Sequence, residues 1–221
     1  PDWDRMAPFL ARAMDRVPVT HEVGIRSFFC GPESFTPDLQ PIVGPAPGFG
    51  ARGADIDSQG VAWVSLGSGH MASFDRRKCK GPLNGAKATG QHCREGWTFY
   101  PEPLPQPKGV TDVGSVEASY YTWVDQFDTF GLGANVPINT GNASEALLAL
   151  KDGNWVVLRV PYPTGFYTKW MDGRIDDPAR GWKGKGLWST TGTRTPFPME
   201  GGRGTTSKVV KFQLRPNPLA K

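Results

Sequence analysis

The sequence predicts a mainly β fold made of short antiparallel strands and preceded by one helix. Gly (28) and Pro (21) together make up more than a fifth of the 221 residues, and both residues disfavour helix interiors. Eight Trp and twelve Phe supply the large apolar side chains that a folded core needs. Since no apolar run approaches the length of a membrane span, we expect a soluble chain with no membrane partner.

The first expected element is a helix over residues 1–17. Asp2 is its candidate N-cap, and Pro18 ends it because the residue before a proline avoids the α conformation. A strand over 21–29 and a turn over 31–34 follow. The apolar residues of the helix recur at steps of three and four: Trp3, Met6, Phe9, Leu10, Ala13, Met14 and Val17.

The most distinctive part of this first segment is the stretch GPESFTPDLQPIVG, residues 31–44. With it, residues 1–47 resemble a segment of the dimethylglycine/sarcosine dehydrogenase family of FAD-dependent oxidoreductases. The resemblance implies an incomplete flavoprotein-like segment that lies near the flavin and the substrate in such enzymes. A partial FAD-dependent amine oxidoreductase is therefore one alternative for the function.

A glycine pattern of the dinucleotide-binding type occurs at Gly48, Gly50 and Gly53. It follows a proline-rich stretch and precedes a turn at 57–60, whereas a pyrophosphate group needs a helix N-terminus directly behind the glycines. We therefore expect no bound FAD.

From about residue 49 onwards, short strands alternate with turns. The predicted strands cover 61–65, 70–75, 146–150, 155–160, 187–190 and 208–214. A turn, a strand with Trp and a second strand that ends in Phe-Asp form the hairpin pattern of a propeller blade. Residues 48–221 are therefore predicted to form a partial, antiparallel β-propeller-like domain.

Three stretches of this domain, residues 55–93, 119–150 and 160–197, carry a second resemblance. They resemble the C-terminal part of bacterial virginiamycin B lyase-like (streptogramin lyase-like) β-propeller proteins, many of which are exported. The resemblance implies a ligand-binding or lyase-like module, with a non-catalytic scaffold or interaction domain as a further alternative. Because the chain starts at Pro1 with no Met and no signal-like apolar stretch, we expect it to be cut from a longer protein. The resemblance implies that this longer protein is exported. A natural fusion and an engineered, chimeric sequence are the alternatives for the junction near residue 48.

His70 is the candidate general base, because it lies at a turn-strand junction and an imidazole exchanges protons near neutral pH. The alternative is a histidine bonded structurally to the neighbouring turn. Ser65, Ser68 and Ser73 lie nearby in the sequence, but no G-x-S-x-G motif contains them.

Two acidic clusters are candidate Mg²⁺ or Ca²⁺ sites, since carboxylate oxygens near glycines suit these ions. One contains Asp125 and Asp128, and the other contains Asp172 and Asp176. The alternative is that these aspartates cap turns through their own backbone.

An aromatic set, Tyr120, Tyr121 and Trp123, is a candidate lining for a small-molecule ligand. The alternative is packing between blades. For Trp63, Trp155 and Trp188 we expect burial between sheets.

The three cysteines leave several arrangements open. Cys79 and Cys93 bracket a loop that one disulfide would close, with Cys30 left free. Free thiols at both positions, or a metal site that includes His92, are the alternatives.

The formal net charge is +4, and its only cluster, Arg76 to Lys78 with Lys80, is expected to be a solvated loop. No nucleic-acid partner is predicted. Residues 49–221 suffice for at most about four blades of ~40–45 residues. Such an incomplete propeller is expected to self-associate or to remain an open arc of sheets.

Overall fold

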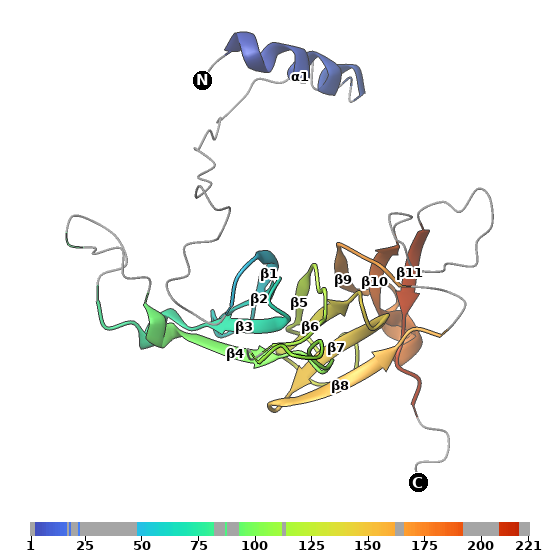
Figure 1. Cartoon of the computed structure of the whole chain (residues 1–221). Helices are drawn as coiled ribbons and strands as arrows, with labels where there is room; N and C mark the ends of the chain where they lie inside the picture. The colour runs from blue at the N-terminus through green and yellow to red at the C-terminus, as the bar shows by residue number, and fades with distance from the viewer. Residues whose placement is uncertain are drawn as a thin grey trace. The chain divides into compact units, whose positions relative to one another are not determined.

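The computed structural model describes residues 3–16, 18, 22, 48–81, 87, 93–111, 114–161, 166–191 and 208–216. The chain divides into two compact units, Pro1–Leu39 and Gln40–Lys221. In the first unit, helix α1 covers Trp3–Arg16, which confirms the predicted helix (Figure 1). The strand expected over 21–29 and the turn expected over 31–34 lie outside the described residues.

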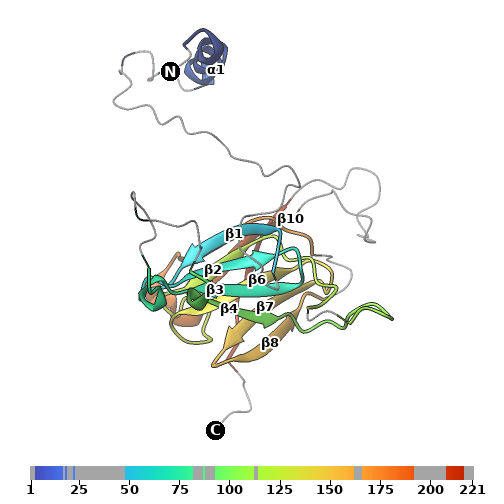
Figure 2. The same ribbon diagram turned by 60° about the vertical axis from the view of Figure 1, so that its left-hand side comes forward.

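The described part of the second unit forms three antiparallel sheets, whose strands follow one another in sequence order. Sheet 1 contains β1 (Ala51–Ile56), β2 (Ala62–Leu66), β3 (His70–Phe74) and β4 (Trp97–Pro101). Sheet 2 contains β5 (Thr122–Asp125), β6 (Val136–Gly141), β7 (Ala146–Lys151) and β8 (Asn154–Arg159). Sheet 3 contains β9 (Met171–Ile175), β10 (Lys185–Thr191) and β11 (Lys208–Phe212). Figure 2 shows the strands of sheet 1 and of sheet 2 as successive meanders.

The first strands of the three sheets lie next to one another. β5 packs against β1 on one side and against β9 on the other (Figure 1). Two hydrogen bonds tie sheet 1 to the segment around β5: Gly53 N donates to Tyr120 O (3.1 Å), and Val124 N donates to Asp55 Oδ2 (2.9 Å). Meander sheets that meet through their first strands have the blade arrangement of a propeller. The predicted mainly β, propeller-like class is therefore confirmed, and the described strands form an open set of blades.

Two glycines explain how these first strands approach so closely. A Cβ atom on Gly53 of β1 would overlap the ring of Tyr121, and one on Gly173 of β9 would overlap the ring of Trp123. The two aromatic side chains at the start of β5 therefore occupy space that only glycine leaves open on the neighbouring strands.

Sheets 2 and 3 share the larger apolar core. Its buried members are Trp123, Phe130, Val136, Ile138, Leu147, Ala149, Phe166, Met171 and Leu187. Sheet 1 has a smaller core of Val64, Leu66 and Ala72, against which Trp97 and Phe99 pack. The larger core therefore forms between two neighbouring sheets, whereas the smaller core consists of sheet 1 residues alone.

Six strands lie where the sequence predicts them, and β1, β4, β5, β6 and β9 were missed. β6 contains Pro137 and Gly141, and β9 contains Gly173; Pro and Gly are depleted in strands and interrupt the local strand pattern. Tertiary pairing decides their conformation, because each is hydrogen-bonded to an adjacent strand along its length.

The expected burial of three tryptophans is wrong in degree, because Trp63, Trp155 and Trp188 are each half-buried. Two of them use their indole N–H groups at the edge of the fold. The Trp63 N–H donates to Asp57 Oδ2 (3.1 Å), and the Trp155 N–H donates to the carbonyl oxygen of Pro101 (2.7 Å). An indole that holds such a bond keeps its polar end near the surface.

The structure joins Cys79 to Cys93 in a disulfide, the pairing expected from the sequence, while Cys30 lies outside the described residues. Thiol titration of the denatured, unreduced protein is therefore expected to count one free thiol, and three after reduction. A count of three before reduction would show that the bridge does not form.

No helix in the described part of the chain has the length and apolar character needed to cross a membrane.

Candidate functional site

The candidate site lies where the first strands of the three sheets begin. Four residues form it, and we call them the strand-start cluster: Arg52, Tyr120, Tyr167 and Lys169. Arg52 is the second residue of β1, while Tyr120 and Lys169 each precede their strand, β5 and β9, by two residues. Because β1, β5 and β9 pack side by side, the side chains at the starts of these strands lie close together.

The Tyr120 ring is the centre of the strand-start cluster. The Arg52 guanidinium carbon lies 3.8 Å from the ring centroid, and the Lys169 ammonium nitrogen lies 5.0 Å from it. The Tyr167 ring is tilted against the same ring, with 5.5 Å between centroids. Cations over an aromatic face are attracted by its quadrupole, so the ring holds both charges in position.

The strand-start cluster is positively charged and open to solvent. Arg52 and Lys169 are exposed, and neither forms an ion pair with a carboxylate of the described residues. The pKa of the Tyr120 phenol is lowered, chiefly by its hydrogen bond with Tyr167 and further by the charges of Arg52 and Lys169, against the opposing effect of burial. The same charges that favour a phenolate would favour a bound anion.

Of the three predicted ligand-lining aromatics, only Tyr120 belongs to this cluster. Tyr121 and Trp123 pack onto Gly53 and Gly173, which is the role between blades that the sequence left open. Burial raises the pKa of Tyr121, and the nearby carboxylates of Asp55 and Asp172 raise it further.

His70 lies at the start of β3 and is fully buried. Its Nδ1 atom is 3.1 Å from the Ser68 hydroxyl oxygen, and its ring meets Phe99 edge-on. Burial lowers the pKa of the imidazole. A base must reach the proton it removes. This imidazole is enclosed by the fold. A catalytic role for His70 remains a prediction from the sequence.

The first predicted acidic cluster serves backbone turns. The Asp125 carboxylate accepts from the backbone N–H groups of Thr129 (2.8 Å) and Phe130 (2.7 Å), and burial raises its pKa. Asp128 accepts from the N–H of Gly133 (2.8 Å). These bonds hold the loop after β5, the turn-capping role that the sequence left open.

The second predicted acidic cluster is paired with cations. Asp172 forms an ion pair with Arg174, and Asp176 forms one with Lys211. In the part of the chain that the structure describes, no three or more His, Cys, Asp or Glu side chains are placed to hold a metal ion. The structure therefore does not bring the four aspartates together, and the Mg²⁺ or Ca²⁺ site remains a prediction.

A buried carboxylate that no sequence pattern predicts lies between sheets 1 and 2. Glu102, directly after β4, is 3 % exposed and accepts from the Ser119 hydroxyl and from the Asn139 amide, both at 2.6 Å. Burial raises the pKa of Glu102 to about 7, although its hydrogen bonds lower it. Glu102 stands in the proline-rich stretch PEPLPQP, a composition typical of an exposed loop, so no local signal marks its burial.

No protein-family model matches the chain. A 46-residue stretch, 21% of the chain, is 52% identical to the mitochondrial sarcosine dehydrogenase of Mus musculus and 50% identical to that of Homo sapiens. The match covers 5% of each enzyme, so the chain spans about a twentieth of the length of these relatives. The sequence resemblance of one segment to the sarcosine dehydrogenases is thereby confirmed.

Among solved structures, virginiamycin B lyase from Staphylococcus aureus matches with a TM-score of 0.40 and 14% identity. The match covers 78% of this chain and 43% of the lyase. This lyase belongs to the protein group of the second sequence resemblance.

Proposed function

We propose that residues 48–221 act as a propeller-type binding module that takes a small anionic ligand at the strand-start cluster. The observation that carries this proposal is the placement of two exposed cations, Arg52 of sheet 1 and Lys169 of sheet 3, on the ring of Tyr120 in between. A small anion bound there would contact all three sheets.

The chemistry of these groups suits an anion. A guanidinium presents several N–H donors in one plane, and its bonds to carboxylate or phosphate are stronger than bonds between neutral groups. Stacking on Tyr120 restricts the Arg52 side chain before binding, so less conformational entropy is lost when the ligand arrives.

The other functions named from the sequence find less support in the described geometry. Flavin-dependent amine oxidation would draw on the first unit, of which the structure describes little more than α1. Lyase-like chemistry would need a base, and Tyr120 with its lowered pKa is the candidate at this site. A role as a non-catalytic scaffold does not explain why Arg52 and Lys169 lie together with no carboxylate partner among the described residues.

We also propose that the protein is exported. The Cys79–Cys93 disulfide supports this location, since disulfides persist in oxidising compartments outside the cytosol.

The binding proposal predicts that citrate or inorganic phosphate binds at constant ionic strength and raises the melting temperature. Arg52→Gln and Lys169→Gln should each weaken binding about tenfold, because a hydrogen bond to a charged group contributes about 1.5–3 kcal/mol. Calorimetric titration gives the dissociation constants.

Arg76→Gln is the matched control, because Arg76 is equally cationic and exposed but lies in the turn after β3. It should leave the dissociation constant unchanged. Failure of both anions to bind would contradict the proposal, and so would equal affinities in all three variants.

A further inference from the structure

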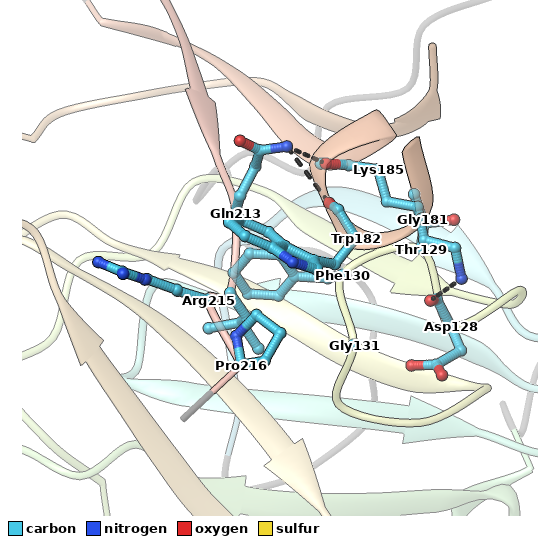
Figure 3. Close-up of a pocket in the computed structure, with 12 residues that line it drawn as sticks. Asp128, Thr129, Phe130, Gly131, Gly181, Trp182, Lys185, Gln213, Arg215 and Pro216 are labelled. Atoms are coloured by element: carbon cyan, nitrogen blue, oxygen red, sulfur yellow. Dashed lines mark hydrogen bonds between the residues drawn. The ribbon is translucent and has the colours of Figure 1, made fainter. Parts of the chain in front are cut away.

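A pocket of about 480 Å³ lies between the loop after β5, the turn before β10 and the end of β11 (Figure 3). It is separate from the strand-start cluster and shares none of its residues. The pocket is lined by Asp128, Thr129, Phe130, Gly131, Gly181, Trp182, Lys185, Gly186, Gln213, Leu214, Arg215 and Pro216. Its volume lies in the range of small-molecule sites.

The wall of this pocket is fixed by hydrogen bonds that cross between elements. The Gln213 amide nitrogen donates to the carbonyl oxygens of Trp182, Lys183 and Lys185, which ties β11 to the turn before β10. The Lys185 ammonium group donates to the carbonyl oxygen of Asp128 (3.3 Å), which ties the same turn to the loop after β5. Figure 3 shows the bonds of Gln213 to Trp182 and Lys185 on one side of the pocket and the bond between Lys185 and Asp128 on another. A site held in this way is formed before any ligand arrives.

The surface inside the pocket is mostly apolar. Trp182 lines the pocket and is 38% exposed. Phe130, which is 4% exposed, and Leu214 and Pro216 are the other apolar residues that line the pocket. These groups give a ligand ring an apolar lining to contact.

Two cations line the pocket: Lys185, whose ammonium group bonds to the carbonyl oxygen of Asp128, and Arg215. Arg215 is exposed and forms no ion pair within the described part of the chain. Figure 3 shows Arg215 and the carboxylate of Asp128 at opposite ends of the pocket. A guanidinium beside an apolar surface in this arrangement suits a ligand that carries a carboxylate on a ring.

We propose that this pocket is a second binding site, which takes an aromatic carboxylate with its ring on the Trp182 indole and its carboxylate on Arg215. A sugar acid would fit the charge equally well, but its hydroxyl groups need several hydrogen-bond partners. The polar atoms available for them are mostly engaged, since the Gln213 amide nitrogen, the Lys185 ammonium group and Asp128 Oδ1 already bond to the backbone. The pocket therefore favours a ring without hydroxyl groups.

The test uses 1-naphthoate as the probe, with glucuronate as the sugar acid and 1-naphthalenemethanol as the uncharged ring. Naphthoate is expected to bind and to shift the indole N–H resonance of Trp182, which the Trp182→Leu variant identifies. Arg215→Gln should weaken binding about tenfold, and Trp182→Leu should weaken it at least as much. Glucuronate and the uncharged ring should bind at least tenfold more weakly than naphthoate.

Two control variants separate this site from the rest of the molecule. Trp170 has the same exposure as Trp182, 38%, so Trp170→Leu should leave naphthoate binding unchanged. Arg52→Gln should also leave it unchanged, which makes the result independent of the strand-start cluster. Unchanged affinity in both Arg215→Gln and Trp182→Leu would overturn the site, and equal binding of glucuronate would overturn the ligand class.

Discussion

Phe166→Ala is expected to lower the free energy of unfolding by about 3–5 kcal/mol, because it removes a large side chain from a closed core. Phe166 is 1% exposed and meets the ring of Phe212 edge-on, with 5.6 Å between centroids. It belongs to the core that sheets 2 and 3 share, so its loss affects both sheets at once. Urea unfolding measures the change as a lower midpoint at an unchanged slope.

Phe127→Ala is the matched control, because Phe127 is 76% exposed. It should change the free energy of unfolding by less than about 0.5 kcal/mol. If both substitutions have equally small effects, sheets 2 and 3 do not share a core.

The second large effect concerns pH and Glu102. Its pKa is about 7 in the folded protein and 4.5 for an ordinary glutamate. The folded state therefore binds more protons than the unfolded state between these values, and stability falls as the pH rises through this window. The pKa difference corresponds to about 3 kcal/mol, which is present below pH 4.5 and fully lost above pH 7.

Glu102→Gln isolates this effect, because glutamine carries no charge at any pH. The difference in unfolding free energy between Glu102→Gln and the unsubstituted protein should rise by about 3 kcal/mol between about pH 4.5 and pH 8. The comparison is needed because His70, whose pKa burial lowers, makes stability rise with pH up to about 6.5. A flat difference for Glu102→Gln would mean that its carboxyl group is not buried.

The sequence predicts those elements of the fold that a short stretch of residues marks by itself. The alternation of Val209 to Phe212 and the Asp152-Gly153 turn after β7 are patterns that a strand and a tight turn produce on their own. The strands β1, β5 and β9 carry no such signal, although they form the centre of the arrangement. Their conformation depends on contacts between residues far apart in sequence, such as Asp55 with Val124.

Of the candidate site, the sequence predicts only the aromatic content. Tyr120 was found because it belongs to a dense aromatic stretch, whereas Arg52 and Lys169 are isolated cations that nothing in the sequence distinguishes from solvated ones. Arg52 and Lys169 can be identified as site residues only from the fold, which places both cations over the Tyr120 ring. The burial of His70 could not be predicted either, because its position at a turn in the sequence is typical of an exposed side chain.

The central claim is that the starts of three sheets converge on Tyr120, and the pKa of this phenol tests it most directly. The chain has five Tyr, so tyrosine labelled at the ring carbon that bears the hydroxyl gives few resonances, and Tyr120→Phe identifies the relevant one. The pKa of Tyr120 should lie below the ordinary value of about 10. Arg52→Gln in sheet 1 and Lys169→Gln next to sheet 3 should each raise it, whereas Arg76→Gln should not. A pKa that neither Arg52→Gln nor Lys169→Gln changes would contradict the convergence of the three sheets.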